Sequence, residues 1–340
     1  MIRIGLVGLG YLGRIHLRVL QELPVHFQIA GVYDHNRERS NELRSQEPQF
    51  TIFTSYQELL QNADAVAIIA STPAHYVLAA EAISAGKAVF IEKPVCSLLC
   101  DAQQLKELSE QHQVLVQVGH IERFNPLVMA LASQREGEAI QVLKSNRSAP
   151  FQFRGSEVSV VLDLMIHDID LTLALNQVAI DTIEVVAKQE RSEHPDEVWA
   201  KLTFSNGMVA ELFASRIAAQ RTRTIDLTDS QASYHLDLIK QEITIQSITG
   251  ENNTLQEQAH NAMQQQWLEF ANCYEKQLVP TVDIQAGIAA LQLALQIEAR
   301  AKEYISQNTS INFTIEMVDE FMMYWDYFYL QENISIPLNI

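Results

Sequence analysis

The chain has 340 residues, of which 47% are hydrophobic and 19% charged, so its composition is that of a folded protein and excludes extensive disorder. Its length is about twice that of a common domain, which favours two domains. The formal net charge of −18 opposes nucleic acid and anionic lipid as partners, and any phosphorylated ligand needs a local cluster of arginine or lysine.

A glycine motif follows the first expected strand. Residues 2–7 are apolar except for Arg3, and the segment 8–13 reads G-x-G-x-x-G before apolar residues at helical spacing. In this context the glycines permit a tight turn, the approach of a pyrophosphate to the backbone, and close packing of helix on strand. The helix N-terminus favours the anion. The residues that we expect to contact a dinucleotide here are Gly8, Gly10, Tyr11, Leu12 and Gly13.

An acid ends the second expected strand. The apolar run 29–33 leads into Asp34, which lies 21 residues after Gly13. An acid at this distance can accept hydrogen bonds from both ribose hydroxyls and repels a 2′-phosphate. Arg37 and Arg39 follow closely and could soften that repulsion. NAD is therefore favoured as the cofactor, and NADP stays as the second possibility.

Strands and helices alternate through the first 120 residues. The further expected elements are a short helix opened by the capping box at 55–58, strands at 65–70, 88–91 and 114–118, and a helix at 74–85. This alternation predicts a doubly wound parallel sheet, in which ligands bind beyond the carboxyl ends of the strands. Thr72-Pro73 and Glu92-Lys93-Pro94 come directly after two of these strands, so we expect them at the ligand edge.

From residue 123 the alternation gives way to strands. The expected strands are 182–188, 198–204, 208–213, 222–228, 232–236 and 243–248. Asn206-Gly207 favours a tight hairpin turn between two of them. This series predicts one antiparallel sheet with a face left for a partner subunit. Helices are expected again at 260–275 and 283–304.

Asp163 and His167 form a polar pair in an apolar segment. They are four residues apart, so on a helix they lie on one face. Apolar neighbours should partly desolvate them, and an acid beside the imidazole would orient the ring and favour imidazolium. A helix cap and a core histidine would explain the same two residues. Asp168 and Asp170 flank the pair, and we expect them to face solvent or cap the sheet.

Taken together, these motifs resemble the Gfo/Idh/MocA family of nicotinamide oxidoreductases. The likeness rests on the glycine motif at 8–13, Thr72-Pro73, Glu92-Lys93-Pro94 and Asp163-x-x-x-His167, and it covers residues 1 to about 305. It implies an α/β protein in which an N-terminal Rossmann domain precedes an α/β domain with a large open antiparallel sheet. It also implies substrates such as sugars or cyclitols, whose ring hydroxyl is oxidised. The predicted divisions are 1–119, 120–308 and a C-terminal extension 309–340, with the helix 283–304 packing back on the first domain.

The resemblance also implies roles for individual residues. Lys93 would lie beside the nicotinamide, and Asp163 and His167 would face the substrate; these three are the expected catalytic residues. The cofactor-binding residues that it adds to the glycine motif and Asp34 are Thr72, Pro73, His75, Glu92, Lys93 and Pro94. The expected substrate-binding residues are Arg123, Asn125, Arg154, Asp163 and His167.

A narrower likeness concerns the substrate. The segments 119–126 and 161–171 resemble the branch of the family that oxidises the 3-hydroxyl of UDP-N-acetylglucosamine to a ketone. Such a substrate brings two phosphate groups to an acidic protein. The candidate counter-charges are Arg123, Lys144, Arg147 and Arg154. Phe151 and Phe153, beside Arg154, could stack on the uracil or the sugar.

Oxidation of an alcohol needs a base for the hydroxyl proton and a donor for the developing alkoxide. His167 is the expected base, oriented by Asp163, with Lys93 as the donor. Lys93 could itself be the base, and the residues do not decide between the two. Glu92 could pair with Lys93 or with a base of the second domain, and a cis bond is possible at Lys93-Pro94. The other functions left open are a dehydrogenase of another sugar or cyclitol and a non-catalytic NAD(H)-sensing regulator.

The remaining features bear on location and assembly. Three cysteines, no leading basic and apolar signal segment, and no apolar run of about 20 residues predict a cytoplasmic protein without a membrane span. No metal site is expected, because Cys96 and Cys100 lack further ligands nearby. We expect a homo-oligomer, a dimer or tetramer, formed through the open sheet. The C-terminal extension is acidic and carries an aromatic cluster at 321–329, and we expect it to be buried against this chain or a neighbour, or to form a lid.

Overall fold

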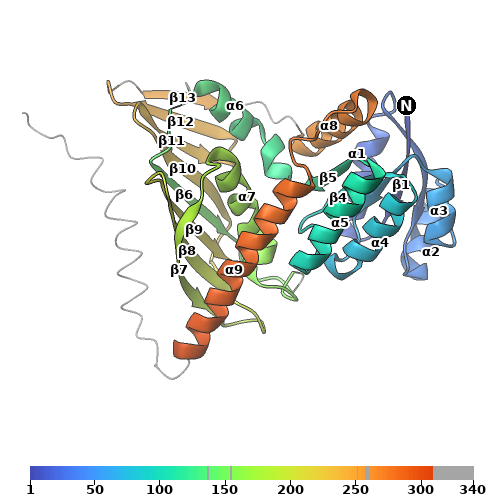
Figure 1. The fold of residues 1–340 in the computed structure, drawn as a ribbon, viewed down its shortest axis with the longest axis horizontal. Helices are drawn as coiled ribbons and strands as arrows, with labels where there is room; N and C mark the ends of the chain where they lie inside the picture. Colours follow the sequence, from blue (N-terminus) through green and yellow to red (C-terminus); the bar gives the residue numbers. More distant parts are fainter. Residues whose placement is uncertain (136–137, 154, 251, 257–260, 309–340) are drawn as a thin grey trace, which may run out of the picture.

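The computed structural model of the protein describes residues 1–135, 138–153, 155–250, 252–256 and 261–308 (Figure 1). Two β-sheets lie side by side, each with its own helices, and the long helix α9 (Ile284–Asn308) runs between them (Figure 1). The expected α/β fold is confirmed. The predictions for Arg154 and for the C-terminal segment 309–340 fall outside the described residues.

The first sheet has five parallel strands in the order β2-β1-β3-β4-β5. Its strands are β1 (Ile2–Val7), β2 (Phe27–Tyr33), β3 (Ala65–Ile68), β4 (Ala88–Glu92) and β5 (Val116–Gly119). Its helices are α1 (Tyr11–Gln21), α2 (Arg37–Gln46), α3 (Tyr56–Asn62), α4 (Thr72–Ser84) and α5 (Leu99–His112). All four residues of β3 are fully buried, as expected of a central parallel strand covered on both faces.

The glycine motif has the geometry for which glycine is needed. Gly8 has φ +99°, a conformation that other residues rarely adopt. At Gly13 an added Cβ would lie only 1.9 Å from the carbonyl oxygen of Gly8, so a side chain cannot fit where helix α1 crosses the loop. A Cβ at Gly10 would meet only Arg39, at 4.0 Å. The backbone at Gly10 is therefore open to a ligand.

The second sheet has eight strands in the order β13-β12-β11-β10-β6-β9-β8-β7. Its strands are β6 (Val142–Ser148), β7 (Ile180–Lys188), β8 (Glu197–Phe204), β9 (Val209–Ser215), β10 (Thr222–Thr228), β11 (Ala232–Asp237), β12 (Glu242–Ser247) and β13 (Asn252–Gln256). The large sheet is antiparallel, as predicted, except at one pair, because β6 and β9 are parallel. A parallel pair needs a crossover connection, and here the chain between them passes through a helix and the β7–β8 hairpin.

Further helices pack on one face of this sheet or join it to the first. They are η1 (a 3-10 helix, Ile121–Phe124), α6 (Pro126–Gln134), η2 (a π-helix, Val161–Met165), α7 (Ile166–Leu175) and α8 (Ala262–Lys276). Helix α8 packs on α1, and its Trp267 and Phe270 belong to the core of the first sheet. Helix α9 contacts α5 and β5 on one side and α7 and β7 on the other. The division at residues 119 and 120 stays our proposed boundary.

Predicted strands of the second sheet coincide closely with those observed, and β10 has the predicted bounds. The Asn206-Gly207 turn is also present, with Gly207 at φ +86°. Strand β6 was missed because Ser145 and Arg147 occupy two of its buried positions, so apolar and polar residues do not alternate there.

Within the described ranges, no helix combines the length and the apolar character that a membrane span requires. The same residues contain no group of three or more His, Cys, Asp or Glu side chains arranged to hold a metal ion. All three cysteines are free, and Cys100 is exposed.

Candidate active site

Lys93 connects the two sheets at the carboxyl edge of the first. It follows β4 directly, and its peptide bond to Pro94 is cis, as the sequence allowed. Its Nζ donates a hydrogen bond of 2.6 Å to the main-chain oxygen of Asp163 and lies 3.5 Å from the Oδ1 of the same residue. The predicted lysine and the predicted acid therefore meet, although they are 70 residues apart in sequence.

Asp163 lies in the π-helix η2, and His167 lies in the first turn of α7. Short π segments are rare and are frequent at functional sites. Burial holds the pKa of His167 well below its ordinary value, and the positive charges of Lys93 and Arg147 lower it further. The prediction of an imidazolium held by Asp163 was wrong, because the charges that act most strongly on this ring are cations. A neutral imidazole is the form that can accept a proton.

Two more histidines border this region. Both ring nitrogens of His120 and the Nδ1 of His167 are buried and hydrogen-bonded to none of the described residues. The ring nitrogens of His75 lie 2.9 Å from the main-chain oxygen of Pro94 and 3.1 Å from that of Ala70. His75 therefore ties the loop after β3 to the loop after β4, which carries Lys93.

Glu92 is buried, and its hydrogen-bond partners are His16 on α1 and the backbone of Lys93. Its Oε1 lies 2.9 Å from the Nε2 of His16, and its Oε2 accepts the backbone N–H of Lys93 at 3.1 Å. The indole N–H of Trp267 donates to the Nδ1 of His16 at 3.1 Å. Because Nδ1 accepts, Nε2 carries the proton and donates to Glu92. The expected side-chain partners of Glu92, Lys93 or a base of the second domain, were wrong.

These contacts keep Glu92 ionised, with its carboxylate at the backbone N–H of Lys93. Burial alone would raise the pKa of Glu92, but the hydrogen bond from His16 and the nearby charge of Lys93 outweigh burial and lower that pKa. Gly119 leaves room for the acid, because a Cβ there would lie 2.9 Å from the Glu92 carboxyl. Trp267 and His16 thus act on the backbone of Lys93 through Glu92.

Substitution of Trp267 by phenylalanine tests these contacts. The ring keeps most of its packing against Phe90, but the Nδ1 of His16 loses its donor in a buried site. We expect the free energy of unfolding in denaturant to fall by about 1–3 kcal/mol, the cost of an unsatisfied buried polar atom. Tyr274→Phe, on the same helix but partly exposed, is the control and should change stability by less than about 0.5 kcal/mol. Equal stabilities of the two variants would contradict the assigned hydrogen bond.

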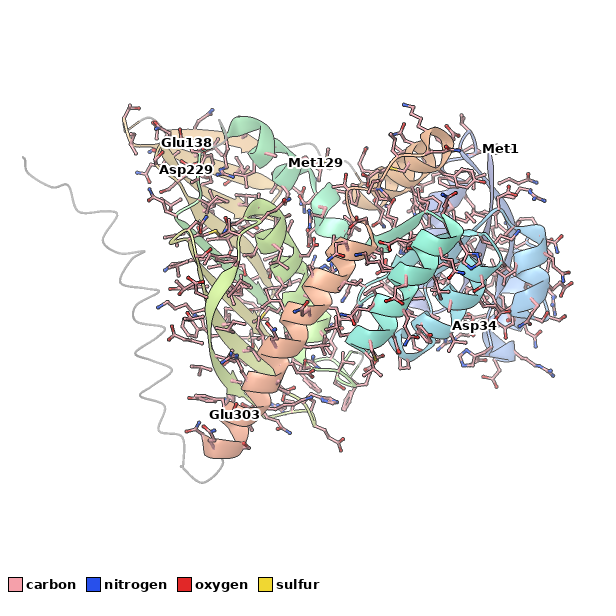
Figure 2. All side chains as sticks on the ribbon, viewed as in Figure 1. Met1, Asp34, Met129, Glu138, Asp229 and Glu303 are labelled. Carbon is pink, nitrogen blue, oxygen red and sulfur yellow. The ribbon has the colours of Figure 1, made fainter. Side chains whose placement is uncertain are left out.

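Asp34, the acid predicted to bind the ribose, lies directly after β2 (Figure 2). Asp34 is buried, and its Oδ2 accepts the backbone N–H of Leu9 at 2.6 Å, which joins the acid to the glycine loop. Arg39 lies 3.7 Å from the same oxygen. Together with the open backbone at Gly10, this arrangement fits a ribose on the acid and a pyrophosphate at the start of α1.

Several predicted counter-charges are paired within the protein. Arg123 makes two hydrogen bonds, of 2.6 and 2.9 Å, to the carboxylate of Asp170, and Arg147 bonds to Asp168 and Glu122. Asp168 and Asp170 are therefore buried ion-pair partners, and the expectation that they face solvent was wrong. The reason is that each acid meets an arginine from a distant segment.

Two other predicted residues have structural contacts. Lys144 lies 3.3 Å from Glu211, and the alternation of β6 puts it on the face opposite Arg147. Asn125 caps α6 by accepting the N–H of Leu127, and it donates to Glu122 at 3.0 Å. A role for Asn125 or Arg123 in substrate binding stays a prediction.

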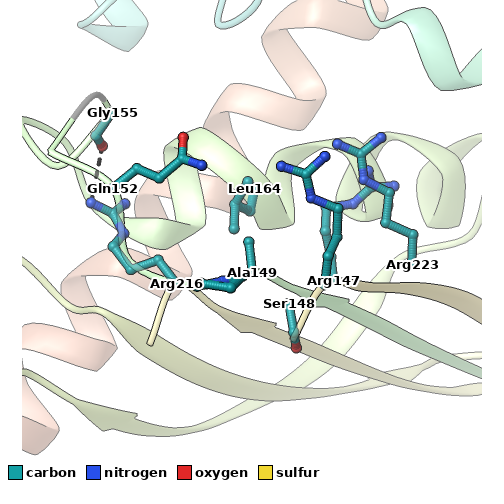
Figure 3. A pocket seen from close by; sticks show the side chains of 10 residues that line it. Arg147, Ser148, Ala149, Gln152, Gly155, Leu164, Arg216 and Arg223 are labelled. Carbon is teal, nitrogen blue, oxygen red and sulfur yellow. Dashed lines mark hydrogen bonds between the residues drawn. The ribbon is translucent and has the colours of Figure 1, made fainter. Parts of the chain in front are cut away.

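A pocket that the sequence did not predict lies beside this site (Figure 3). It is lined by four arginines and by neighbouring loop and helix residues, namely Arg147, Arg216, Arg221, Arg223, Ala149, Pro150, Gln152, Gly155 and Leu164. The signal that could have revealed it is the group of three arginines between residues 216 and 223 in a chain of net charge −18.

Comparison with known proteins decides the family. Residues 2–120 match the model of an oxidoreductase family with an NAD-binding Rossmann fold, and residues 141–239 match the GFO/IDH/MocA C-terminal domain. The chain belongs to the Gfo/Idh/MocA family. It is therefore an oxidoreductase with NAD as its cofactor, and the cradle described above fits that cofactor.

Within this family, the chain is 30% identical over 314 residues to UDP-N-acetylglucosamine 3-dehydrogenase from Acidithiobacillus ferrooxidans, covering 90% of this chain and 99% of that one. The solved structure of that enzyme superposes with a TM-score of 0.85, at 29% identity, over 89% of this chain and 99% of the other. The inositol 2-dehydrogenase of Agrobacterium fabrum is 31% identical, but over 179 residues only, 50% of this chain and 53% of that one.

Proposed function

We propose that the protein is an NAD-dependent dehydrogenase that oxidises a ring secondary hydroxyl of a nucleotide sugar, with UDP-N-acetylglucosamine as substrate and its 3-keto derivative as product. The observation that carries the proposal is the convergence of Lys93, Asp163 and a neutral His167 where the two sheets meet. These groups supply a hydrogen-bond donor and a proton acceptor to one alcohol.

The roles follow from the contacts. Bound NAD supplies the hydride acceptor. His167 accepts the hydroxyl proton, because the neutral imidazole of this half-buried residue has a free lone pair, and cationic neighbours favour loss of that proton again. Asp163 holds the Lys93 ammonium at the domain junction, so that the lysine can donate to the substrate oxygen as negative charge develops on it. Lys93 as the base remains the alternative role.

Two observations favour a nucleotide sugar over a cyclitol. The relative that acts on UDP-N-acetylglucosamine matches over nearly its whole length, whereas the inositol dehydrogenase matches over about half. The pocket beside Asp163 is lined by arginines, and a neutral cyclitol has no group that would use them.

A substrate panel tests the proposal. Purified protein with NAD should form NADH in the presence of UDP-N-acetylglucosamine. With free N-acetylglucosamine or myo-inositol, kcat/KM should be at least about tenfold lower. These compounds lack the diphosphate, and the loss of its charge-assisted contacts should cost more than about 1.4 kcal/mol of binding free energy. Faster turnover of the unphosphorylated compounds would favour a sugar or cyclitol dehydrogenase. NAD binding without turnover of any member would favour a regulator that senses the cofactor.

We also propose that the protein assembles as a homodimer or tetramer through the eight-stranded sheet. The helices of this domain lie on the face toward the first domain, and no described helix covers the opposite face (Figure 1). That face carries Trp199 opposite Phe213 in the strand register, beside the Lys201 and Glu211 pair. Aromatic residues are enriched in interfaces, so the Trp199 and Phe213 pair suits a contact between copies.

A further inference from the structure

The arginine-lined pocket has a volume of about 120 Å³ and adjoins the proposed reaction site. Leu164, next to Asp163 in the chain, forms part of its wall. Gly155 forms another part and packs against the Asp163 side chain, since a Cβ at Gly155 would lie 2.9 Å from Oδ2. A ligand held at Lys93 can therefore continue into this pocket.

Arg216 is the most buried of its cations apart from Arg147, with 5% of the residue exposed. Its Nη1 donates to the main-chain oxygen of Gly155 at 2.9 Å. Its Nε and Nη2 are buried and hydrogen-bonded to none of the residues that the structure describes. Buried guanidinium N–H groups normally have partners, so these two point to a ligand with acceptor oxygens.

The nearby acid does not satisfy Arg216. Asp196 Oδ1 lies 4.0 Å from the Arg216 Nε, too far for a hydrogen bond. The Asp196 carboxylate instead accepts the backbone N–H groups of Glu190, Arg191 and Ser192, at 2.6 to 3.1 Å, and the Ser192 hydroxyl at 2.6 Å. Asp196 thus fixes the loop between β7 and β8 and leaves the donors of Arg216 for another group.

Arg223 and Arg221 complete the cationic wall. Arg223 is exposed, and its guanidinium lies beside that of Arg147 (Figure 3). Glu122 and Asp168 bond to Arg147. In the described part of the chain, no hydrogen bond or ion pair joins the side chain of Arg223 or Arg221 to an acid. Neighbouring like charges repel, and an anion placed between them would remove that repulsion.

We propose that this pocket binds the diphosphate of the nucleoside diphosphate sugar, with Arg216 and Arg223 as the main donors. The inference rests on the proposed function, because it assigns the phosphate groups of the same substrate. The nucleoside would extend toward Phe153, which is 88% exposed and touches Phe151 edge to face at 5.6 Å. An exposed aromatic ring at the rim of an anion site suits stacking on a base.

Calorimetric titration of the full-length protein saturated with NADH tests this assignment. UDP and inorganic pyrophosphate should bind, and myo-inositol should not compete with them. Arg216→Met and Arg223→Met should each weaken UDP binding at least about tenfold, since each removes charge-assisted hydrogen bonds. Arg300→Met, an exposed change on α9, is the matched control and should leave UDP affinity unchanged. All variants should bind NADH like the wild type.

The outcomes separate this inference from the proposed reaction. UDP lacks the hexose, so its binding is measured without turnover. Failure to oxidise UDP-N-acetylglucosamine while UDP still binds through Arg223 would count against the reaction and support the pocket. Wild-type affinity of Arg223→Met for UDP, or no binding of UDP and pyrophosphate to the wild type at millimolar concentration, would overturn the pocket assignment. The exposed Arg223 variant carries the test if loss of the buried Arg216 prevents folding.

Discussion

Replacing Lys93 by methionine is expected to lower kcat by about a hundredfold or more, the usual effect of removing a donor to a developing oxyanion. Methionine keeps much of the side-chain length but has no ammonium, so the 2.6 Å hydrogen bond to Asp163 is lost together with the donor to the substrate oxygen. The cradle for the dinucleotide lies at Gly10 and Asp34, so the affinity for NADH, measured by its fluorescence, should change little.

The matched control is Lys87→Met. Lys87 directly precedes β4, so it lies at the opposite end of the same strand, away from the carboxyl edge. Its loss changes the net charge by the same amount and should leave kcat within about twofold of the wild type. Retention of more than a third of the wild-type kcat by Lys93→Met would remove the lysine from the mechanism.

The Rossmann part of the fold could be predicted because its signals are local. The glycine loop requires the positive φ of Gly8 and the absence of a side chain at Gly13. Both requirements can be recognised within one six-residue segment. The buried strands are short continuous apolar runs. Their length and their flanking turn residues indicate parallel strands covered on both faces. The position of Lys93 followed from the rule that ligands bind beyond the carboxyl ends of parallel strands.

The electrostatics of the site could not be predicted in the same way, because the charges that decide them come from distant segments. His167 was expected to be cationic beside Asp163, but its pKa is lowered by burial first and then by Lys93 and Arg147, which approach it from other parts of the chain. Asp168 was expected at the surface, but Arg147, 21 residues earlier, pairs with it in the interior. The hydrogen bond from Trp267 to His16 spans 251 residues and leaves no mark on local sequence patterns.

These long-range pairs also give the site its shape. Arg147 of β6 pairs with Glu122 of η1 and Asp168 of α7. Separating either pair would leave an uncompensated charge in the interior, which is costly. Arg147 therefore fixes β6, η1 and α7 relative to one another. The same arginine forms a wall of the anion pocket and lowers the pKa of His167. One residue therefore couples the packing of the second domain to both the proposed base and the proposed phosphate site.

Replacing His167 by glutamine is expected to lower kcat by about 10²- to 10⁴-fold, because glutamine has a similar size but cannot accept the hydroxyl proton. The pH dependence of kcat in the wild type gives a second, independent prediction. At low pH the imidazole of His167 is protonated and cannot accept the hydroxyl proton, so kcat falls. Because the pKa of His167 is lowered, this fall should occur well below pH 6.5, the ordinary histidine value. His112→Gln, exposed at the end of α5, is the control and should keep the wild-type rate and profile.

This substitution also decides between the two candidate bases. If His167 is the base, added imidazole should restore part of the activity of a second variant, His167→Gly, because a small base can enter the space left by the ring and take the proton. If Lys93 is the base, His167→Gln should lose less than about tenfold in kcat, and imidazole should have no effect on His167→Gly. The loss of rate in His167→Gln and the response of His167→Gly to imidazole therefore distinguish the two candidate bases.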